Sequence, residues 1–377
     1  MSQNGCMRAS AIAILVLSVL MAVAAPLLGV AITGQAVMPY LDFPPRTEFV
    51  PHAPFAWGAF SALSLPAIGA LALYAIALFH ARPVPREQPL RPFPWWGWLG
   101  LVFVAGGWVL AWSGDFVPPG WRRHTFTPLW LGYILVMNGL AARRSGRSLL
   151  THRSGWFLAL FPVSALFWWL FEYLNQFVDS WYYTGIHASS DWDYFIQATL
   201  PFSSVLPAVA STWAWLRTFP RVEAMSLPAV RGHAALPWLA LFAGALGLAG
   251  IGVWPDALYG MLWLAPLLVL CGLQQLMLEE PYFAPLERGD WRPVLQPALA
   301  ALVCGFFWEM WNYGSLAKWH YSIPYAQRFH LFEMPLLGYA GYLPFGVECA
   351  LVMDLVARIV ERRALWPLDH PARGAEQ

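Results

Sequence analysis

FFWEMWN, residues 306–312, places one carboxylate among four aromatic rings near the end of an apolar segment. An earlier stretch, FWWLFEYLN at residues 167–175, has nearly the same pattern. A charged side chain at the centre of a bilayer costs roughly 2.5–3.5 kcal/mol. Because the chain contains this costly arrangement twice, the two stretches indicate a duplicated helical element whose Glu has a role.

The composition points to a lipid environment. Of the 377 residues, 59% are hydrophobic and 11% are charged, whereas about 25% are charged in an ordinary soluble domain. Several apolar stretches reach the roughly 20 residues that a helix needs to cross about 30 Å of hydrocarbon. The sequence therefore predicts an all-α, polytopic helical membrane protein with about ten transmembrane helices. The net charge of +1 argues against a nucleic-acid partner, which would require a concentrated basic surface.

Ten spans are expected between the charged or proline-rich breaks. They cover residues 10–33, 55–80, 96–113, 127–142, 155–176, 196–217, 237–254, 257–278, 295–313 and 338–360. Of the 22 Lys and Arg, 17 then fall on one side of the membrane and five on the other. The positive-inside rule places the richer side, with both termini, in the cytoplasm. The first span is expected to stay uncleaved, because its apolar run is longer than that of a typical signal peptide.

A tandem parallel repeat is expected in the last eight spans. The stretch PLWLGYILVMNGL (residues 128–140) matches MLWLAPLLVLCGL (residues 261–273), and Leu206-Pro207 matches Leu343-Pro344 farther along. An even number of spans per copy gives both copies the same orientation, related by a pseudo-twofold axis along the membrane normal. The expected parts are residues 1–93 with two helices and a proline-rich outer loop, 94–235 and 236–363 as four-helix repeats, and 364–377 as a disordered cytoplasmic tail.

The duplicated Glu is the candidate catalytic group. Glu172 precedes Asn175 by three residues, as Glu309 precedes Asn312, and both pairs fall where a span reaches the outer face. This spacing puts Glu and Asn on one side of a helix, where the amide can donate a hydrogen bond to the carboxylate. We therefore expect Glu309 to be the principal acid or base, oriented by Asn312, with the earlier pair as its counterpart.

Aromatic and polar residues follow both pairs and are expected to form an outward-facing cavity. Rings offer apolar walls and π faces, which suit a lipid, an isoprenoid, a sugar ring or a cation. The expected ligand-binding residues are Trp308, Trp311, Trp319, His320, Tyr321, Glu333, Glu348, Trp181 and Tyr183. The alternative is purely structural, because Trp and Tyr anchor helices at the membrane interface and a Glu near the interface can reach water.

Three weaker features complete the pattern. Arg122, Arg123 and His124 lie on the outer face against the positive-inside trend, which suits either interface anchoring or an acidic ligand. Asp354 and Arg358, four residues apart, predict an ion pair within one helix. The four Cys are far apart and show no metal-ligand spacing, so neither a metal nor another cofactor is expected.

Three stretches carry a family resemblance: FHLFEMPLLGYAGYLPFGVE (residues 329–348), FFWEMWN…KWHYSIPY before it, and PPR…VPHAPFAW in the first outer loop. Together they resemble a group of bacterial inner-membrane proteins. The resemblance covers most of the chain and is most specific in the second copy of the repeat. It implies a bacterial polytopic inner-membrane protein and assigns it no reaction.

The sequence favours a membrane protein that binds a lipid-like or isoprenoid-linked ligand in this cavity, with acid/base catalysis as a further expectation. A proton-coupled secondary transporter is the alternative, because internal repeats and intramembrane carboxylates suit alternating access. A structural or assembly protein without a catalytic site is the second alternative. Membrane lipids are the expected partners in all three cases.

Overall fold

The computed structural model describes residues 3–84, 89–366 and 368. These residues are predominantly helical and include two small two-stranded sheets, which confirms the helical class. Arg86 and Arg373, which enter the predicted charge asymmetry, lie outside the described residues, as does most of the expected tail.

The elements follow one another in the order of their numbers. The longer helices are α1 (Gln3–Ile32), α2 (Trp57–His80), α3 (Trp95–Ala111), α5 (Phe126–Ser145), α7 (Ser154–Asn175), α8 (Asp191–Phe202), α9 (Val205–Leu216), α11 (Leu236–Ile251), α13 (Met261–Met277), α14 (Arg292–Gly314) and α15 (Tyr342–Val360). The short helical turns are η1 (Met38–Leu41), η2 (Gly114–Phe116), α4 (Pro119–Arg122), α6 (Leu149–His152), α10 (Pro220–Glu223), α12 (Pro255–Leu258), η3 (Ala284–Arg288) and η4 (Leu336–Gly341). The strands are β1 (Trp181–Thr184), β2 (Lys318–Tyr321), β3 (His330–Leu331) and β4 (Met334–Pro335).

Among the described residues, four helices, α1, α2, α7 and α14, are long and apolar enough to cross a membrane. Helices α3, α11 and α13 are also apolar, but they have only 17, 16 and 17 residues. At 1.5 Å per residue such helices rise roughly 24–26 Å, slightly less than the hydrocarbon thickness. The described chain therefore contains several helices suited to a membrane.

The expected span at residues 196–217 is not one helix. α8 ends at Phe202, and α9 begins at Val205 after two serines. Pro201 lies in the last turn of α8, where its ring and missing N–H interrupt the helical hydrogen-bond ladder. The hydroxyls of Ser203 and Ser204 donate to carbonyls of that last turn, 2.7 and 2.6 Å away. Each part has 12 residues and rises about 18 Å, too little to cross a bilayer alone.

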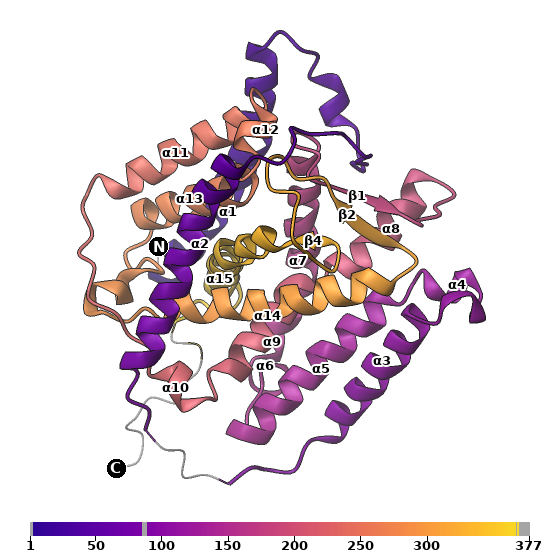
Figure 1. Ribbon diagram of the computed structural model, residues 1–377. Coiled ribbons are helices and arrows are strands. Elements are labelled where there is room, and N and C mark those ends of the chain that lie inside the picture. Colours follow the sequence, from indigo (N-terminus) through magenta and orange to yellow (C-terminus); the bar gives the residue numbers. More distant parts are fainter. Residues whose placement is uncertain (1–2, 85–88, 367, 369–377) are drawn as a thin grey trace.

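The helices pack in a pattern that recurs along the chain. α3 packs against α5 and α7 against α9, while α11 packs against α13 and α14 against α15. We call α3, α5, α7, α8 and α9 the first set of helices, and α11, α13, α14 and α15 the second set. Between these two sets, α14 packs against α9 and α15 packs against α7. Figure 1 shows the α3–α5 and α11–α13 pairs on opposite sides of a centre formed by α7, α9, α14 and α15. Helices in corresponding positions of the two sets thus have corresponding neighbours.

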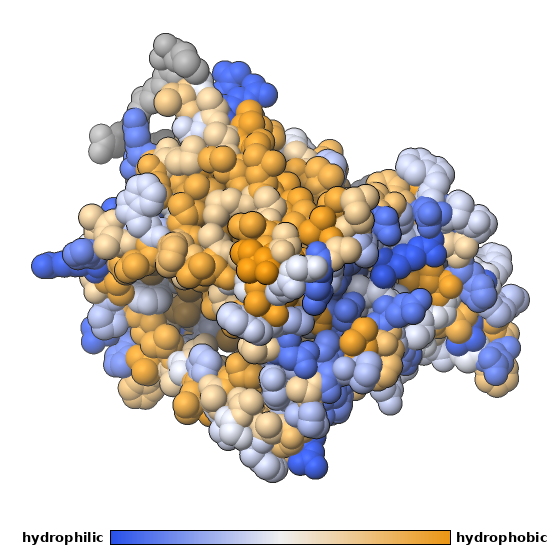
Figure 2. Space-filling model, turned by 90° about the horizontal axis from the view of Figure 1, so that it is seen from above, coloured by the Kyte–Doolittle hydropathy of each residue, from blue (hydrophilic) through white to orange (hydrophobic). Residues whose placement is uncertain are grey.

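The surface of α2 is the most exposed apolar surface among the long helices. Only Ala77 of α2 is buried, although the helix is rich in Leu, Ile, Ala and Phe. Figure 2 shows a broad hydrophobic area on one face of the molecule, with hydrophilic residues gathered elsewhere on that face. Soluble proteins rarely leave contiguous apolar areas of this kind in water, so the exposed helices are suited to lipid.

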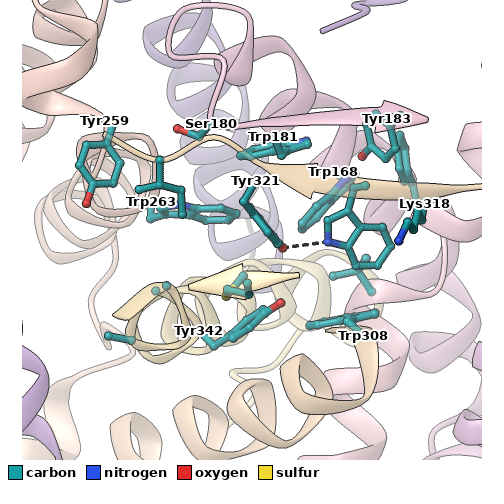
Figure 3. Close-up of a pocket in the computed structure, with 18 of the residues that line it drawn as sticks. Trp168, Ser180, Trp181, Tyr183, Tyr259, Trp263, Trp308, Lys318, Tyr321 and Tyr342 are labelled. Carbon is teal, nitrogen blue, oxygen red and sulfur yellow. Dashed lines mark hydrogen bonds between the residues drawn. The ribbon is translucent and has the colours of Figure 1, made fainter. Parts of the chain in front are cut away.

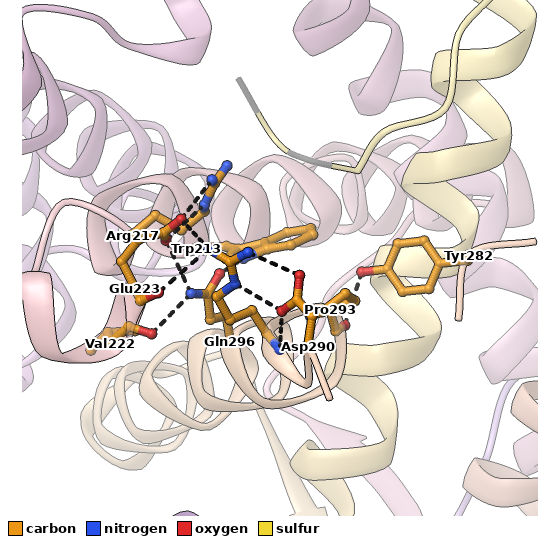
Figure 4. A network of polar contacts seen from close by, with 9 residues as sticks. Trp213, Arg217, Val222, Glu223, Tyr282, Asp290, Pro293 and Gln296 are labelled. Carbon is orange, nitrogen blue, oxygen red and sulfur yellow. Dashed lines mark hydrogen bonds and ion pairs between the residues drawn. The ribbon is translucent and has the colours of Figure 1, made fainter. Parts of the chain in front are cut away.

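A polar network fixes the end of α9 to the start of α14 (Figure 4). The carboxylate of Glu223 in α10 pairs with Arg217 at 3.1 Å and with Arg292 at 2.9 Å. Gln296 of α14 accepts a hydrogen bond from the indole of Trp213 at 3.0 Å. The two Arg charges hold the pKa of Glu223 below its usual value against the effect of burial, which alone would raise it. This network is a structural joint between the two sets of helices.

The first residues of the expected tail are packed against this joint. The ring of Trp366 stacks on Trp213 with centroids 6.2 Å apart. The backbone N–H of Leu365 donates to Asp354 at 2.7 Å, and Asp354 also pairs with Arg358 at 2.7 Å. The ion pair within α15 is therefore confirmed, and residues 364–366 do not form the disordered segment that the sequence suggested.

Candidate functional site

The two aromatic loops that follow α7 and α14 form strands and pair with each other. Their antiparallel register joins Trp181 to Tyr321, Tyr182 to His320, Tyr183 to Trp319 and Thr184 to Lys318. The stretches WYY (residues 181–183) and WHY (residues 319–321) match each other, which makes Trp319 the counterpart of Trp181 and His320 that of Tyr182. Tyr182 therefore pairs with its own counterpart. A strand pair centred on equivalent residues is what a local twofold axis produces. The sequence identified the loops but not their β-structure.

An Asn at the end of each preceding helix holds its strand. The amide of Asn175 donates to the carbonyl of Trp181 at 2.8 Å, and its oxygen accepts from the N–H of Ser180 at 2.9 Å. Asn312 makes the same kind of contacts, with the carbonyl and N–H of Trp319 at 2.8 and 2.9 Å. The expected role of Asn in orienting the carboxylate is therefore wrong. An amide side chain offers one donor side and one acceptor side, and here both are used by the strand backbone.

Glu172 is buried and receives three hydrogen bonds from aromatic side chains. The donors are the indole of Trp168 at 2.9 Å, the indole of Trp181 at 3.2 Å and the hydroxyl of Tyr183 at 2.5 Å. All three reach the same oxygen, Oε1. Trp168 lies one helical turn before Glu172, while the other two donors come from β1.

Glu309 is fully buried and receives two hydrogen bonds. The hydroxyls of Tyr321 and Tyr342 donate to its Oε1 at 2.7 and 2.8 Å. Its other oxygen, Oε2, has no hydrogen-bond partner in the described part of the chain. The indole of Trp319 donates to the hydroxyl of Tyr321 at 2.9 Å. A buried carboxylate oxygen without a donor is costly, which makes this the less satisfied of the two sites.

A cavity of about 500 Å³ lies between these two sites. Figure 3 shows Trp308 and Tyr342 on one side of the space, and Trp181 and Trp263 across from them. The aromatic lining consists of Phe126, Trp168, Trp181, Tyr183, Tyr194, Phe202, Tyr259, Trp263, Trp308, Trp319, Tyr321 and Tyr342. Both sets of helices thus contribute rings to one cavity.

Five of the nine expected ligand-binding residues line this cavity: Trp308, Trp319, Tyr321, Trp181 and Tyr183. The two carboxylates lie behind the lining, since Tyr183, Tyr321 and Tyr342 separate them from the open space. The residues that donate to the carboxylates therefore form the cavity wall in front of them: Trp168, Trp181 and Tyr183 for Glu172, and Tyr321 and Tyr342 for Glu309. This placement differs from the expectation that a carboxylate itself would face a ligand.

The other four expected ligand-binding residues lie elsewhere. Trp311 packs against Trp130 in the core, with ring centroids 5.2 Å apart. Glu348 is buried within α15, and its Oε2 lacks a partner among the described residues. His320 and Glu333 contact each other at 3.3 Å outside the cavity. Helical and loop periodicity placed these residues near the site, but side-chain direction decides which of them reach it.

Glu333 forms an ion pair with Lys318, whose Nζ lies 2.5 Å from Oε1. Partial burial alone would raise the pKa of the Glu333 carboxyl. The hydrogen bond and charge of Lys318, with a contribution from His320, lower this pKa below its usual value. Glu333 thus acts as a counterion for the start of β2.

Two important residues were missed by sequence reasoning. Trp168 could have been found, because it lies four residues before Glu172 and hence on the same helical face. Tyr342 lies 33 residues after Glu309 at the start of α15, and no local spacing connects them. Only the packing of α14 against α15 brings its hydroxyl to the carboxylate.

Comparison with known proteins adds no family, because no protein-family model, curated protein or solved structure matches the chain.

Proposed function

We propose that the protein binds a lipid-like or isoprenoid-linked ligand in the aromatic cavity between its two sets of helices. The observation that carries this proposal is the cavity itself, with about 500 Å³ of space and twelve lining rings. Small-molecule sites typically have about 300–1,000 Å³ and predominantly apolar walls with a few polar groups. The size and chemistry of the lining favour an apolar ligand with a limited number of polar atoms.

We also propose that the chain is a ten-span protein of the bacterial inner membrane with both termini in the cytoplasm. The exposed apolar surface of α2 and the four long apolar helices support a membrane location. The broken segment α8–α9 would then be a re-entrant or discontinuous span, of the kind tolerated where backbone lines a cavity. Phe202 and Val205, on either side of the break, do line the cavity.

A tandem repeat of four helices is the third part of the proposal. The first copy would consist of α3, α5, α7 and the broken span α8–α9. The second copy would consist of α11, α13, α14 and α15. The corresponding packing partners support it, as does the strand pair centred on Tyr182 and His320. Under this proposal the cavity lies near the pseudo-twofold axis, where repeat proteins of membranes commonly bind their ligands.

Acid/base chemistry in this cavity would pass through tyrosine. Tyr321 lines the cavity and donates its hydrogen to Glu309. Burial, with the nearby Glu309 charge, raises the pKa of Tyr321 well above its usual value, so its hydroxyl stays protonated near neutral pH. If the ligand gave up a proton, Tyr321 would take it while passing its own hydrogen to ionised Glu309; if the ligand took a proton from Tyr321, protonated Glu309 would return one to the phenolate. Glu309 would thus be a positioning residue and a proton store behind Tyr321.

A cavity-blocking variant tests the binding proposal. A Cβ built on Gly341, which lines the cavity, meets only the edge of Trp263 at 4.0 Å, so Gly341→Phe projects into the space without a backbone clash. Native mass spectrometry of gently solubilised wild-type protein should reveal a co-purified lipid or isoprenoid that this variant lacks. Gly106→Phe is the matched control, because Gly106 is exposed in α3 with open space around it. Equal ligand occupancy in both variants would contradict the proposal.

Glu309→Gln tests the acid/base part separately. Once the ligand is identified, this variant should retain folding yield and bound ligand but lose turnover. An equal fall in yield would instead assign Glu309 a structural role. Uptake into sealed vesicles that depends on a proton gradient, without turnover in detergent, would favour the transporter.

A further inference from the structure

The charged residues of the cavity lining all carry positive charge when protonated. They are Arg123, His124 and Lys318, and no Asp or Glu occurs among the described lining residues. The rest of the lining is apolar or carries neutral hydroxyl, indole and amide groups. The cavity therefore combines an extensive aromatic wall with cationic groups of a single sign.

Two of these cationic groups are neighbours in the chain, and the third lies on a strand that contacts the following helix. Arg123 and His124 connect α4 to α5, which begins at Phe126. The ring of Phe126 packs edge-on against Trp319, with centroids 5.4 Å apart. Because Lys318 directly precedes Trp319, this ring contact draws β2 toward the α4–α5 connection.

Arg123 is the cationic group whose charge is least compensated. Lys318 is paired with Glu333, and His124 lies in the electrostatic neighbourhood of Asp193. Within the described part of the chain, Arg123 has no carboxylate at ion-pair distance, and its buried Nε has no acceptor. Arg122 also has a buried Nε without an acceptor, but it faces Asp115 and does not line the cavity. A buried guanidinium N–H without an acceptor is unfavourable, so an oxyanion is the natural complement.

The apolar end of the cavity is bounded by α2. Leu63, Pro66 and Ala67 of this helix line the space, although other faces of α2 are exposed. A hydrocarbon chain lying against these residues would be separated from the surrounding bilayer by a single helix. The cavity thus has an apolar wall beside the membrane and a cationic group at the α4–α5 connection.

We propose that the ligand is an anionic amphiphile, with a phosphate or carboxylate headgroup bound by Arg123 and an apolar chain against the rings and α2. This inference rests on the proposed ligand-binding function and specifies the class of ligand. Arg123 supplies a fork of donors that matches such oxyanions. Lys318 adds long-range positive charge, although Glu333 neutralises most of it.

Binding of matched lipid pairs tests the headgroup. Full-length protein, freed of lipid in a neutral detergent, is titrated with phosphatidic acid and with diacylglycerol of identical acyl chains, and the bound fraction is followed by native mass spectrometry. A fatty acid and the fatty alcohol of equal length form the carboxylate pair. At least one acidic lipid should bind about tenfold or more tightly than its neutral counterpart, because hydrogen bonds to a charged oxyanion are stronger than those to a neutral hydroxyl.

Variants assign that preference to one side chain. Arg123→Gln should remove the tenfold preference while leaving the affinity for the neutral lipid unchanged, and Arg123→Lys should restore part of it. Arg122→Gln is the matched control, because Arg122 faces Asp115 at 3.6 Å and does not line the cavity. A preference that persists in Arg123→Gln would overturn the proposal, as would inorganic phosphate alone binding as tightly as the acidic lipid.

The two levels of the proposal fail differently. If Gly341→Phe abolishes binding of acidic and neutral lipids alike but wild-type protein does not distinguish them, the cavity binds a lipid and the anionic class is wrong. If Gly341→Phe changes the binding of neither lipid, the cavity is not the binding site and the proposed function itself is overturned.

Discussion

Glu172 and Glu309 occupy matching positions in two similar stretches of sequence, yet they obtain their hydrogen bonds from different helices. In both sites a tyrosine of the following strand donates to the carboxylate. The further helical donor is Trp168 of α7 in the first site and Tyr342 of α15 in the second. Two similar carboxylate sites thus have the same kinds of aromatic donor, supplied from different positions in the chain.

The exchange is reciprocal. When Glu172 is matched to Glu309, the counterpart of Trp168 is Gly305, and a Cβ at Gly305 would lie 2.4 Å from the ring of Tyr342. When Leu206-Pro207 is matched to Leu343-Pro344, the counterpart of Tyr342 is Val205. The first site thus has a large residue, Trp168, on the helix that carries Glu172, and a smaller one, Val205, on the facing helix. In the second site the small residue, Gly305, is on the helix of Glu309, and the large one, Tyr342, is on the facing helix.

The two carboxylates differ in how fully they are hydrogen-bonded. Glu172 has three aromatic donors on its Oε1, whereas Glu309 has two, and its Oε2 is fully buried with no hydrogen-bond partner among the described residues. A well-satisfied buried group stabilises a fold, while an unsatisfied one retains capacity for a further contact or a proton. We infer that the first site is mainly structural and that the second is the one to test for acid/base function.

The largest expected effect comes from the two strand-holding amides. Asn175→Ala and Asn312→Ala each leave buried backbone groups of a strand without partners, at about 1–3 kcal/mol per group. Each variant should therefore lose about 2–4 kcal/mol of unfolding free energy, measured by denaturant unfolding in detergent with tryptophan fluorescence. Asn312→Asp keeps the acceptor for the N–H of Trp319 and should lose about half as much. A large loss at only one Asn would break the equivalence of the two sites.

Overpacking at Gly305 is expected to have the next largest effect. Gly305→Ala forces the Tyr342 ring to shift, which should cost about 1–3 kcal/mol. Tyr342→Val removes the ring that the added methyl would meet. Gly305→Ala should therefore cost less unfolding free energy in the Tyr342→Val background than in the wild-type protein, so the two losses should not add. Gly155→Ala in α7 is the control, because a Cβ there meets open space. Additive losses in the double variant would contradict the exchange of large residues.

Removing single hydroxyls should separate the two carboxylates by a smaller amount. Tyr342→Phe leaves Glu309 with one donor, whereas Tyr183→Phe leaves Glu172 with two indoles. We expect the unfolding free energy to fall by about 1–2 kcal/mol for Tyr342→Phe and by about 1 kcal/mol or less for Tyr183→Phe. The second loss is smaller because two indoles still donate to Glu172. Thermal unfolding of the two variants in the same detergent gives the comparison. A larger loss for Tyr183→Phe would reverse the assignment of the structural and the poised site.

The sequence predicted the helices and the aromatic character of the site because both depend on local composition. FFWEMWN and FWWLFEYLN do lie in the last turns of α14 and α7, and the loops after them do supply the lining rings Trp181, Trp319 and Tyr321. It could not predict that Asn312 turns to the strand, because the competing backbone donor and acceptor appear only after β2 folds back. The contribution of Tyr342 likewise requires tertiary packing that no sequence spacing encodes.

The smallest expected effect is a pH dependence of the unfolding free energy that comes from Glu333, which pairs with Lys318 at the start of β2. Because Lys318 lowers its pKa in the folded protein, the pair contributes stability above the unfolded carboxyl pKa of about 4.5 and loses it as the pH falls through the folded value. The pair is partly exposed, so the contribution should stay below about 1 kcal/mol. The difference in unfolding free energy between wild type and Glu333→Gln should therefore shrink as the pH is lowered from 6 toward roughly 3.5. Lys318→Met should remove the same dependence. A difference that stays constant over this range would show that Glu333 acts through packing instead of charge.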